Sequence, residues 1–274
     1  SIDLIIVCSS TPDTIYPAVA CQVQHAIGAK DAAGFDMSLA CSGFVFGLVT
    51  AQQFLKNGTA KQALVIGADI HSRYMDWYDR NTCVLFGDGA GAAVLSGEIG
   101  AEDQFLANKL NIDGSKGSEL TMGVQKENCP LVEKRSEFNP YVEMNGREMF
   151  KFAVGAVPKA IKETVSNAGL SLDEIDHLVL HQANIRIMDA MSEKLNIPKE
   201  KMVTNLERIG NTSAASIPIA LNEAVLNGDV KPGDKLLLCG FGAGVAWGTI
   251  VFRWTAVDQR LSAAAHTEEA VALS

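Results

Sequence analysis

Short apolar runs alternate with amphipathic stretches along the chain. Residues 2–7 read Ile-Asp-Leu-Ile-Ile-Val, a β-branched run that predicts a buried strand. A helix is predicted over 16–27. A second helix begins at Cys41, carries apolar residues at helical spacing and ends at Asn57-Gly58. Further strands are predicted over 35–38, over 63–67 and, after a glycine-rich lead, within 86–95.

The second half of the chain repeats this order of elements. The run 175–180 follows the run 2–7 by 173 residues, and a helix after Asn211 ends in Asn227-Gly228, 170 residues after Asn57-Gly58. Strand patterns over 235–240 and 244–252 then match those over 63–67 and 86–95. A repeat of this length predicts two fused α/β halves, each with a mostly parallel sheet.

The second half also has a long preamble. It contains a strand pattern over 109–113 and an amphipathic helix over 148–168, and the first half has no counterpart for either. We therefore expect the first half, 1–104, to lack a segment at its start, and a version of the chain with that segment to be more stable and more active. The second half is expected to span 105–254, followed by a tail over 255–274 to which we assign no chemistry.

Composition and charge narrow the class of function. The chain has 274 residues, of which 47% are hydrophobic and 20% charged, as in ordinary globular proteins. Its net charge of −9 argues against nucleic acid as a partner. No apolar run reaches the ~20 residues that span a bilayer, and the chain does not begin with a signal peptide pattern. We expect a cytoplasmic protein that has no membrane partner.

Six cysteines are spread along the chain without metal-binding spacing. They are Cys8, Cys21, Cys41, Cys83, Cys129 and Cys239. No CxxC pair or Cys/His spacing suits zinc, so we expect no metal. Five of the six are expected to behave as small buried hydrophobic residues in a reducing compartment.

The repeat offsets bring three reactive residues into equivalent places. Adding 170 to Cys41 gives Asn211, and adding 173 to Cys8 gives His181. Because ligands bind beyond the carboxyl ends of strands in open α/β sheets, Cys41, His181 and Asn211 are expected at one end of the related units. A helix N-terminus beside Cys41 would favour its thiolate.

Each of these residues also has a purely structural interpretation. Cys41 could be a small residue in a tight turn, His181 a structural histidine after a strand, and Asn211 a helix N-cap. If they act in catalysis, His181 can serve as base or hydrogen-bond donor, and the Asn211 amide can donate to an oxyanion. The glycine-rich stretches 87–91 and 240–244 lack the full dinucleotide-binding pattern and are expected to let backbone approach closely.

Several longer motifs resemble β-ketoacyl-acyl-carrier-protein synthase III. They are Ala40-Cys41-Ser42-Gly43-Phe44, Phe86-Gly87-Asp88-Gly89-Ala90-Gly91-Ala92, His181-Gln182-Ala183-Asn184 and the stretch 210–218. The resemblance runs from about Asp3 to Trp254. It implies the thiolase fold, with two duplicated α/β halves in an α-β-α-β-α arrangement, and a homodimer.

The resemblance also implies a reaction. Cys41, His181 and Asn211 would form the catalytic triad, and Cys41 would accept an acyl group from acyl-CoA without any cofactor. Malonyl-acyl-carrier protein would then lose CO₂, and its enolate would attack the acyl-Cys. Hydrogen bonds from His181 and Asn211 would stabilise the malonyl thioester oxygen, and the N–H groups of Cys41 and Ala243 the other oxyanion.

Further positions carry over from the family with substrate-binding roles. The resemblance places Arg80, Phe150, Ala183 and Asn184 at the CoA channel. Phe241 would lie in the acyl-site loop, and Tyr16 would reach into the partner subunit's acyl pocket. Lys151 and Arg186 could form a basic patch for the acyl-carrier protein, or be two solvated charges.

Three other functions stay open. The chain could be a polyketide or secondary-metabolite acyltransferase of the same fold, with a different starter or extender. It could be a cysteine hydrolase, which passes the acyl group to water. It could also be an inactive fragment that only binds acyl-CoA. Starter length and branching depend on packing that the sequence does not reveal.

Overall fold

The protein consists of stacked layers of helices and sheets. The computed structural model describes residues 1–97, 102–124, 131 and 139–255. The first sheet has the order β2-β1-β3-β4, with β1 Leu4–Cys8, β2 Ala33–Met37, β3 Gln62–Ile70 and β4 Asp88–Ser96. The second has the order β5-β10-β9-β8, with β5 Phe105–Ile112, β8 His177–Leu180, β9 Lys235–Gly242 and β10 Ala246–Arg253.

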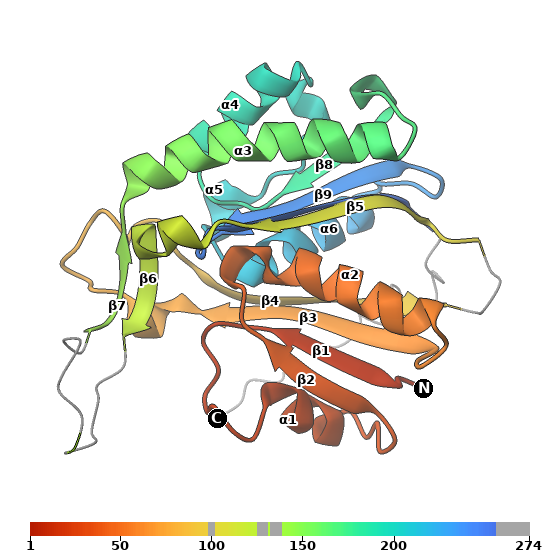
Figure 1. Ribbon diagram of the computed structural model, residues 1–274, viewed down its shortest axis with the longest axis horizontal. Coiled ribbons are helices and arrows are strands. Elements are labelled where there is room, and N and C mark those ends of the chain that lie inside the picture. The colour runs from red at the N-terminus through yellow and green to blue at the C-terminus, as the bar shows by residue number, and fades with distance from the viewer. Residues whose placement is uncertain (98–101, 125–130, 132–138, 256–274) are drawn as a thin grey trace.

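Helices separate the two sheets and lie against the outer face of the second sheet and part of the outer face of the first (Figure 1). They are α1 Val19–Ala26, α2 Gly43–Lys56, α3 Gly146–Asn167, α4 Ile185–Leu195, the short α5 Leu206–Ile209 and α6 Ser216–Leu226. α2 and α6 lie between the sheets, α1 lies outside the first sheet, and α3 and α4 lie outside the second. The predicted α-β-α-β-α arrangement of two α/β halves is therefore confirmed.

The strand directions differ partly from the expectation of mostly parallel sheets. β1 pairs in parallel with β2 and β3, and β8 with β9. The last strand of each half, β4 or β10, instead returns antiparallel to its neighbour. A further antiparallel pair, β6 Leu120–Val124 and β7 Asn139–Met144, stands apart from both sheets.

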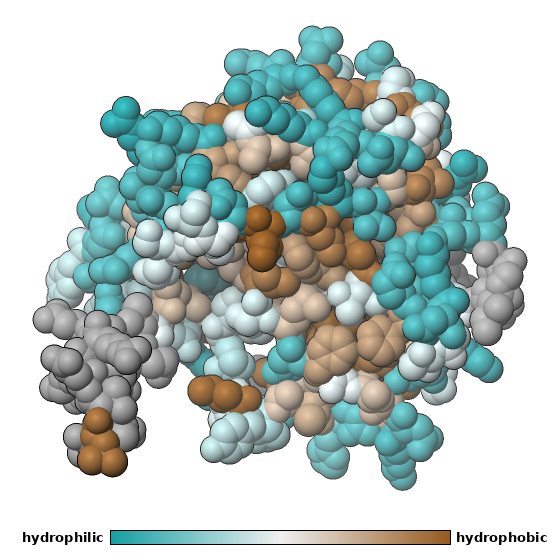
Figure 2. All heavy atoms as spheres, viewed as in Figure 1, coloured by the Kyte–Doolittle hydropathy of each residue, from teal (hydrophilic) through white to brown (hydrophobic). Residues whose placement is uncertain are grey.

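Apolar side chains fill the spaces between these layers. Phe44, Leu48, Ile217 and Leu221, on the helices α2 and α6, form the core between the two sheets. A second core lies under α3 and α4, and a small third cluster lies under α1. In Figure 2 hydrophilic side chains gather over α3 and α4, as expected for helices with one face on a core and the other in water.

Helix α1 begins later than the predicted range 16–27. The Asp36 carboxylate of β2 accepts hydrogen bonds from the backbone N–H groups of Val19 (2.7 Å) and Ala20 (2.9 Å). These are helix-start donors that otherwise lack partners. A residue from the neighbouring strand, which local sequence cannot reveal, therefore sets the start of this helix.

The start of the second-half helix corrects the offset used for Cys41. α2 has 14 residues and α6 has 11, so their ends lie 170 residues apart, whereas their starts at Gly43 and Ser216 lie 173 apart. Each helix follows a three-residue 3₁₀ turn, Ala40–Ser42 or Ser213–Ala215. The structural equivalent of Cys41 is therefore Ala214, and Asn211 lies three residues before it.

The two 3₁₀ turns share an unusual backbone. Their first residues, Ala40 and Ser213, have φ values of 44° and 52°, in the left-handed region that non-glycine residues rarely adopt. Such a conformation costs about 1–3 kcal/mol. The duplication therefore extends to this local strain.

The cysteines are less uniformly buried than expected. Cys8, Cys41 and Cys239 are buried, but Cys21 is exposed and Cys83 is intermediate. Cys21 lies on the solvent side of α1, and Cys83 lies in the loop before β4. Cys129 and nearly all of the tail lie outside the described residues, so the expectations for them stay untested.

Candidate active site

Cys41 lies where the two halves meet. Its side chain is buried, in the 3₁₀ turn that follows β2. A Cβ atom added to Gly242 of β9 would stand 2.9 Å from the Cys41 Cβ and 3.1 Å from its Sγ, and one added to Gly240 would stand 2.9 Å from the Ser42 Cα. Glycine at these positions therefore lets β9 approach Cys41, as expected for the glycine-rich stretch 240–244.

The Cys41 thiol is held in its neutral form. Burial, with a smaller contribution from the nearby Asp69 charge, raises its pKa to about 12. The neighbouring Ser213 side chain and the Cys41 backbone act in the opposite direction, but by less than burial. Burial therefore opposes the thiolate that the helix start is expected to favour.

His181 follows β8 directly and lies against the end of β9. Its backbone N–H donates to the Cys239 carbonyl at 2.8 Å. Its ring meets the Phe241 ring edge-on, with 5.3 Å between centroids, and its Nδ1 lies 2.8 Å from the Ser216 Oγ. Burial, reinforced by His71, lowers the pKa of His181 to about 3, so the imidazole is neutral at neutral pH.

Asn211 is buried and held by its backbone. Its N–H donates to the Leu85 carbonyl and its carbonyl accepts from the Gly87 N–H, each at 2.9 Å. The side-chain Oδ1 accepts from the Ser213 N–H at 2.9 Å, which leaves the Nδ2 group as a donor. Asn211 is not the N-cap of α6, since that helix begins five residues later and Ala215 holds the cap position.

Two short segments bring the three residues together. At the end of β9, Gly242 meets Cys41 and Phe241 meets His181. In the turn before α6, the Ser213 N–H donates to the Asn211 side chain, and the Ser213 side chain lies near enough to Cys41 to affect its pKa. Cys41, His181 and Asn211 therefore each lie next to the end of β9 or the turn before α6.

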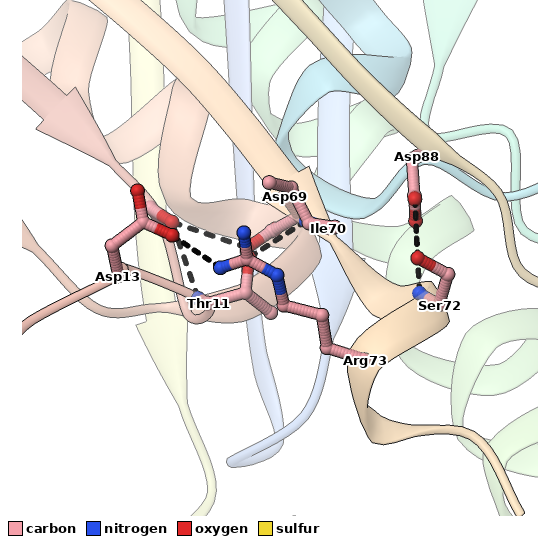
Figure 3. Close-up of polar contacts among 8 residues, drawn as sticks. Thr11, Asp13, Asp69, Ile70, Ser72, Arg73 and Asp88 are labelled. Carbon is pink, nitrogen blue, oxygen red and sulfur yellow. Dashed lines mark hydrogen bonds and ion pairs between the residues drawn. The ribbon is translucent and has the colours of Figure 1, made fainter.

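Asp69, at the end of β3, was not identified from the sequence. Its buried carboxylate accepts from the Ser10 N–H (2.7 Å) and the Thr11 hydroxyl (3.1 Å), and also from the Ala214 N–H (3.3 Å). Thr11 in turn accepts from the Ile70 N–H at 2.7 Å (Figure 3). Asp69 thus links the loop after β1 to the turn that carries Ser213. An acidic residue at the carboxyl end of a buried strand was the available signal.

Polar contacts continue along the segment after Asp69. Figure 3 shows Arg73 paired with Asp13, and Ser72 donating from its backbone N–H (2.9 Å) and its hydroxyl (2.5 Å) to Asp88. These contacts join the end of β3 to the loop after β1 and to the start of β4. The segment that follows β3 is therefore bonded to two neighbouring segments, through Arg73 to one and through Ser72 to the other.

His71 is a second polar residue near the site that the sequence did not single out. It is buried, and its ring stacks on Phe86 with 4.9 Å between centroids. Burial lowers its pKa, while Asp69 and Asp88 oppose that shift. In the part of the chain that the structure describes, its Nδ1 has no hydrogen-bond partner.

The predicted substrate-binding residues differ widely in exposure. Phe241 is buried, Ala183, Asn184 and Ala243 are half-buried, and Arg80, Phe150 and Tyr16 are exposed, Tyr16 by 86%. The Asn184 side chain accepts from the Arg186 N–H at 2.8 Å and so caps α4. Asn184 therefore has a structural role whether or not it touches substrate.

The two proposed carrier-protein residues are both exposed. Lys151 pairs with Glu148 one turn earlier on α3, and Arg186 lies in the first turn of α4. Lys151 also lines a groove of about 390 Å³ between α3 and β5, together with Lys109, Lys116, Lys159, Asp113 and Glu163. Lysines outnumber acidic residues in this groove.

Within the described ranges, no group of three or more His, Cys, Asp or Glu side chains could hold a metal ion. No helix in the described part of the chain is long and apolar enough to cross a membrane.

Family models match both halves of the chain. Residues 35–114 match the model described as 3-Oxoacyl-[acyl-carrier-protein (ACP)] synthase III, and residues 165–254 match its C-terminal counterpart. Curated relatives are highly similar. The Beta-ketoacyl-[acyl-carrier-protein] synthase III of Microcystis aeruginosa is 51% identical over 92% of this chain and 76% of its own length. That of Trichodesmium erythraeum is 48% identical over 92% and 77%.

Solved structures agree with these matches. The 3-oxoacyl-[acyl-carrier-protein] synthase III of Aquifex aeolicus is 45% identical, with a TM-score of 0.83 over 92% of this chain and 77% of that one. The Thermus thermophilus synthase III is 40% identical, with a TM-score of 0.86 over 93% and 78%. A priming β-ketosynthase of the R1128 polyketide pathway is 33% identical, with a TM-score of 0.84 over 93% and 75%.

Proposed function

Because the chain belongs to the β-ketoacyl-acyl-carrier-protein synthase III family, condensing acyltransferases with the thiolase fold that act in type II fatty acid synthesis, we propose that Cys41 carries the acyl group in its reaction. The observation that carries this proposal is the packing of β9 against Cys41 and His181. The buried Cys41 lies against Gly242, and the ring of the neighbouring Phe241 lies against the buried, neutral His181.

The residues divide the chemistry between them. Cys41 Sγ attacks the acyl-CoA thioester, and CoA leaves. Malonyl-acyl-carrier protein then loses CO₂. Asn211 Nδ2 donates to the thioester oxygen of the resulting enolate, and His181 adds a second hydrogen bond whenever it carries a proton at Nε2. The enolate carbon attacks the acyl-Cys carbonyl carbon, and the N–H groups of Cys41 and Ala243 stabilise the oxyanion on the acyl oxygen. The bond to Cys41 Sγ then breaks, the thiolate takes a proton from water, and the β-ketoacyl product leaves; no cofactor takes part.

The remaining site residues surround this centre. We assign Arg80, Phe150, Ala183 and Asn184 to the CoA channel and Phe241 to the acyl site, where its ring lies against His181. The lysine-rich groove beside α3 supports Lys151, with Arg186, as the docking patch for the acidic carrier protein.

The enzyme is proposed to be a homodimer that acts in the cytoplasm, where its two thioester substrates would be found. Ile15 and Tyr16 are 87% and 86% exposed, unusual for large apolar side chains on neighbouring residues. This exposure supports a role for Tyr16 inside the partner's acyl pocket. Sedimentation of the protein and starter selectivity of Tyr16→Ala test the two parts of this assignment.

Intact-protein mass spectrometry tests the nucleophile. The protein is incubated with a panel of acyl-CoAs, and we expect one acyl mass shift that is lost in Cys41→Ala and kept in Cys21→Ala. Cys21 is the control because its thiol is exposed, so unspecific acylation would favour it. An acyl shift that survives in Cys41→Ala would contradict the proposal.

A second measurement separates the condensing reaction from its alternatives. With malonyl-acyl-carrier protein present, we expect a β-ketoacyl product with a new carbon–carbon bond. Release of the free acid alone would indicate a cysteine hydrolase. Because the R1128 priming ketosynthase is also similar, the same assay is run with polyketide starters and extenders.

A further inference from the structure

The two strained 3₁₀ turns meet where the halves join. A Cβ atom added to Gly67 of β3 would stand 2.2 Å from the Ala214 carbonyl oxygen, and one added to Gly240 of β9 would stand 3.1 Å from the Cys41 carbonyl oxygen. Each turn therefore packs on a strand of the other half, and the two turns also contact each other. Side chains of one turn can consequently act on the other.

The Ser213 hydroxyl is buried in the second of these turns. Ser213 is 1% exposed, and its Oγ has no hydrogen-bond partner among the described residues. A buried hydroxyl without a partner is destabilising. The backbone of Ser213 is engaged, because its N–H donates to Asn211 Oδ1 (2.9 Å) and its carbonyl accepts from the Ser216 hydroxyl (2.9 Å). The hydroxyl is therefore free to bond to a group that changes during the reaction.

The backbone of the turn does not account for this serine. The equivalent first residue of the other turn is Ala40, with a φ of 44° against 52° at Ser213. Alanine thus adopts this left-handed conformation in the same molecule without a hydroxyl. The serine adds a hydrogen-bond donor that the turn itself does not require.

Cys41 is the reactive group beside this hydroxyl. Burial raises the pKa of the Cys41 thiol to about 12, and the Ser213 side chain lies close enough to oppose that shift. A neutral thiol is a weak hydrogen-bond acceptor, whereas hydrogen bonds to a charged group are strong. The hydroxyl should therefore interact little with the resting thiol and strongly with a negatively charged sulfur.

We propose that Ser213 is a further catalytic residue, whose hydroxyl donates a hydrogen bond to Cys41 Sγ whenever that sulfur carries negative charge. This inference rests on the proposed role of Cys41 as nucleophile. A donor that is in place before the charge develops stabilises it without reorganisation of the site. The two backbone hydrogen bonds of Ser213 hold the residue in place.

Negative charge reaches the Cys41 sulfur in both steps of the reaction. In acylation, Sγ bonds to the thioester carbonyl carbon, the bond from that carbon to the CoA sulfur breaks, and the thiol proton leaves with CoA. In condensation, the bond from the acyl carbon to Sγ breaks, and the sulfur keeps the electron pair until it takes a proton from water. Ser213 keeps its own proton in both steps, and no other reactant is required.

Alkylation of Cys41 tests the hydrogen bond without acyl-CoA. The protein is treated with iodoacetamide at pH 9, and peptide mass spectrometry follows Cys41 and the exposed Cys21 separately. A hydrogen bond to a charged group shifts its ionisation about 10- to 100-fold, but a more basic thiolate is also more nucleophilic. We therefore expect Ser213→Ala to slow the alkylation of Cys41 about 3- to 10-fold and to leave that of Cys21 unchanged.

Ser213→Gly separates the hydroxyl from the shape of the turn. Glycine removes the same hydroxyl and relieves the left-handed strain, and both variants keep the N–H that binds Asn211. We expect equal slowing in the two variants. A wild-type rate at Cys41 in either folded variant would overturn the proposal. Ser192→Ala is the control, because it loses a buried hydroxyl that donates to the Ile197 carbonyl (2.7 Å), and it should react like the wild type.

Single-turnover acylation extends the test to the reaction itself. We expect both Ser213 variants to be acylated about 3- to 10-fold more slowly, with the acyl-CoA concentration for half-maximal rate unchanged. If no acyl-CoA acylates wild-type Cys41, the proposed function fails, and the alkylation rates still decide whether Ser213 bonds to the sulfur. If wild-type Cys41 is acylated and both Ser213 variants react as fast as Ser192→Ala, the role of Ser213 is refuted.

Discussion

The outer faces of the two sheets carry equivalent strands in opposite surroundings. In the strand registers Gly67 pairs with Gly91 and Gly240 with Gly248, which makes Val94 of β4 the counterpart of Val251 of β10. Val251 is fully buried under α3, whereas Val94 is 57% exposed. The two valines occupy equivalent positions, so the difference in their exposure comes from the elements that pack against them.

The edges of the sheets differ in the same way. β10 is flanked by β9 and β5, but β4 is the last strand of its sheet among the described residues. Neither β5 nor α3 has a counterpart in the described part of the first half, as the sequence predicted. Strand pattern alone therefore predicts that a strand forms and not whether both of its faces are covered.

Placing a charge at the two equivalent valines should produce the largest contrast. Val251→Asp puts an unpaired carboxylate in a sealed core, so we expect a loss of more than about 4 kcal/mol or no folded protein. Val94→Asp should change the free energy of unfolding by less than about 1 kcal/mol. Urea denaturation measures both. Equal losses would mean that the outer face of the first sheet is covered in solution.

Cys8 and His181 occupy equivalent places in the two halves, and each should make the free energy of unfolding depend on pH. The folded-state pKa of His181, about 3, lies below its unfolded value, so only the unfolded chain gains this proton as the pH falls below about 6.5. Stability should fall by about 1.4 kcal/mol per pH unit in that window, or about 2 kcal/mol at pH 5. Urea titrations at pH 7 and pH 5 should show a smaller loss in His181→Gln.

The contribution of Cys8 to the pH dependence of stability has the opposite sign. Burial raises its pKa to about 12, so above pH 9 the unfolded chain releases a proton that the folded chain keeps. This contribution to stability is present below pH 9 and is lost as the pH rises toward 12. Cys8→Ala should therefore lose less stability than the wild type between pH 8.5 and pH 10. Parallel curves for variant and wild type, in either pH range, would contradict the assignment.

A smaller contrast concerns one buried hydrogen bond. Thr249 of β10 meets Thr164 of α3 with 2.5 Å between hydroxyl oxygens, and its first-half counterpart is the exposed Ala92. Thr164→Val leaves a buried hydroxyl without its partner, so we expect a loss of about 1–2 kcal/mol. Thermal unfolding should show most of that loss restored in Thr164→Val/Thr249→Val. Ala92→Thr should be nearly neutral, and a large effect there would argue against an open face.

The sequence was most informative about features that depend on local residue patterns or on the internal repeat. Apolar periodicity located the strands of the two main sheets and the helices α2, α3 and α6, but not β6, β7 or α4. The repeat matched Cys41 with Asn211 wrongly, because an offset taken from helix ends ignores the three extra residues of α2. The sequence also missed the neutral state of the Cys41 thiol, since burial is a property of the assembled fold. Asp69 and Ser216 contact segments distant in sequence, and no local pattern records such contacts.

The two 3₁₀ turns share the same strained backbone, so the turn that carries Cys41 can be compared with one that does not. A left-handed residue beside a nucleophile is readily interpreted as strain kept for catalysis. Here the same conformation precedes Cys41 in one half and Ala214, which has no reactive group, in the other. The left-handed residue is therefore a feature of both halves and is not by itself evidence of catalysis; the two turns differ in the side chain that follows it.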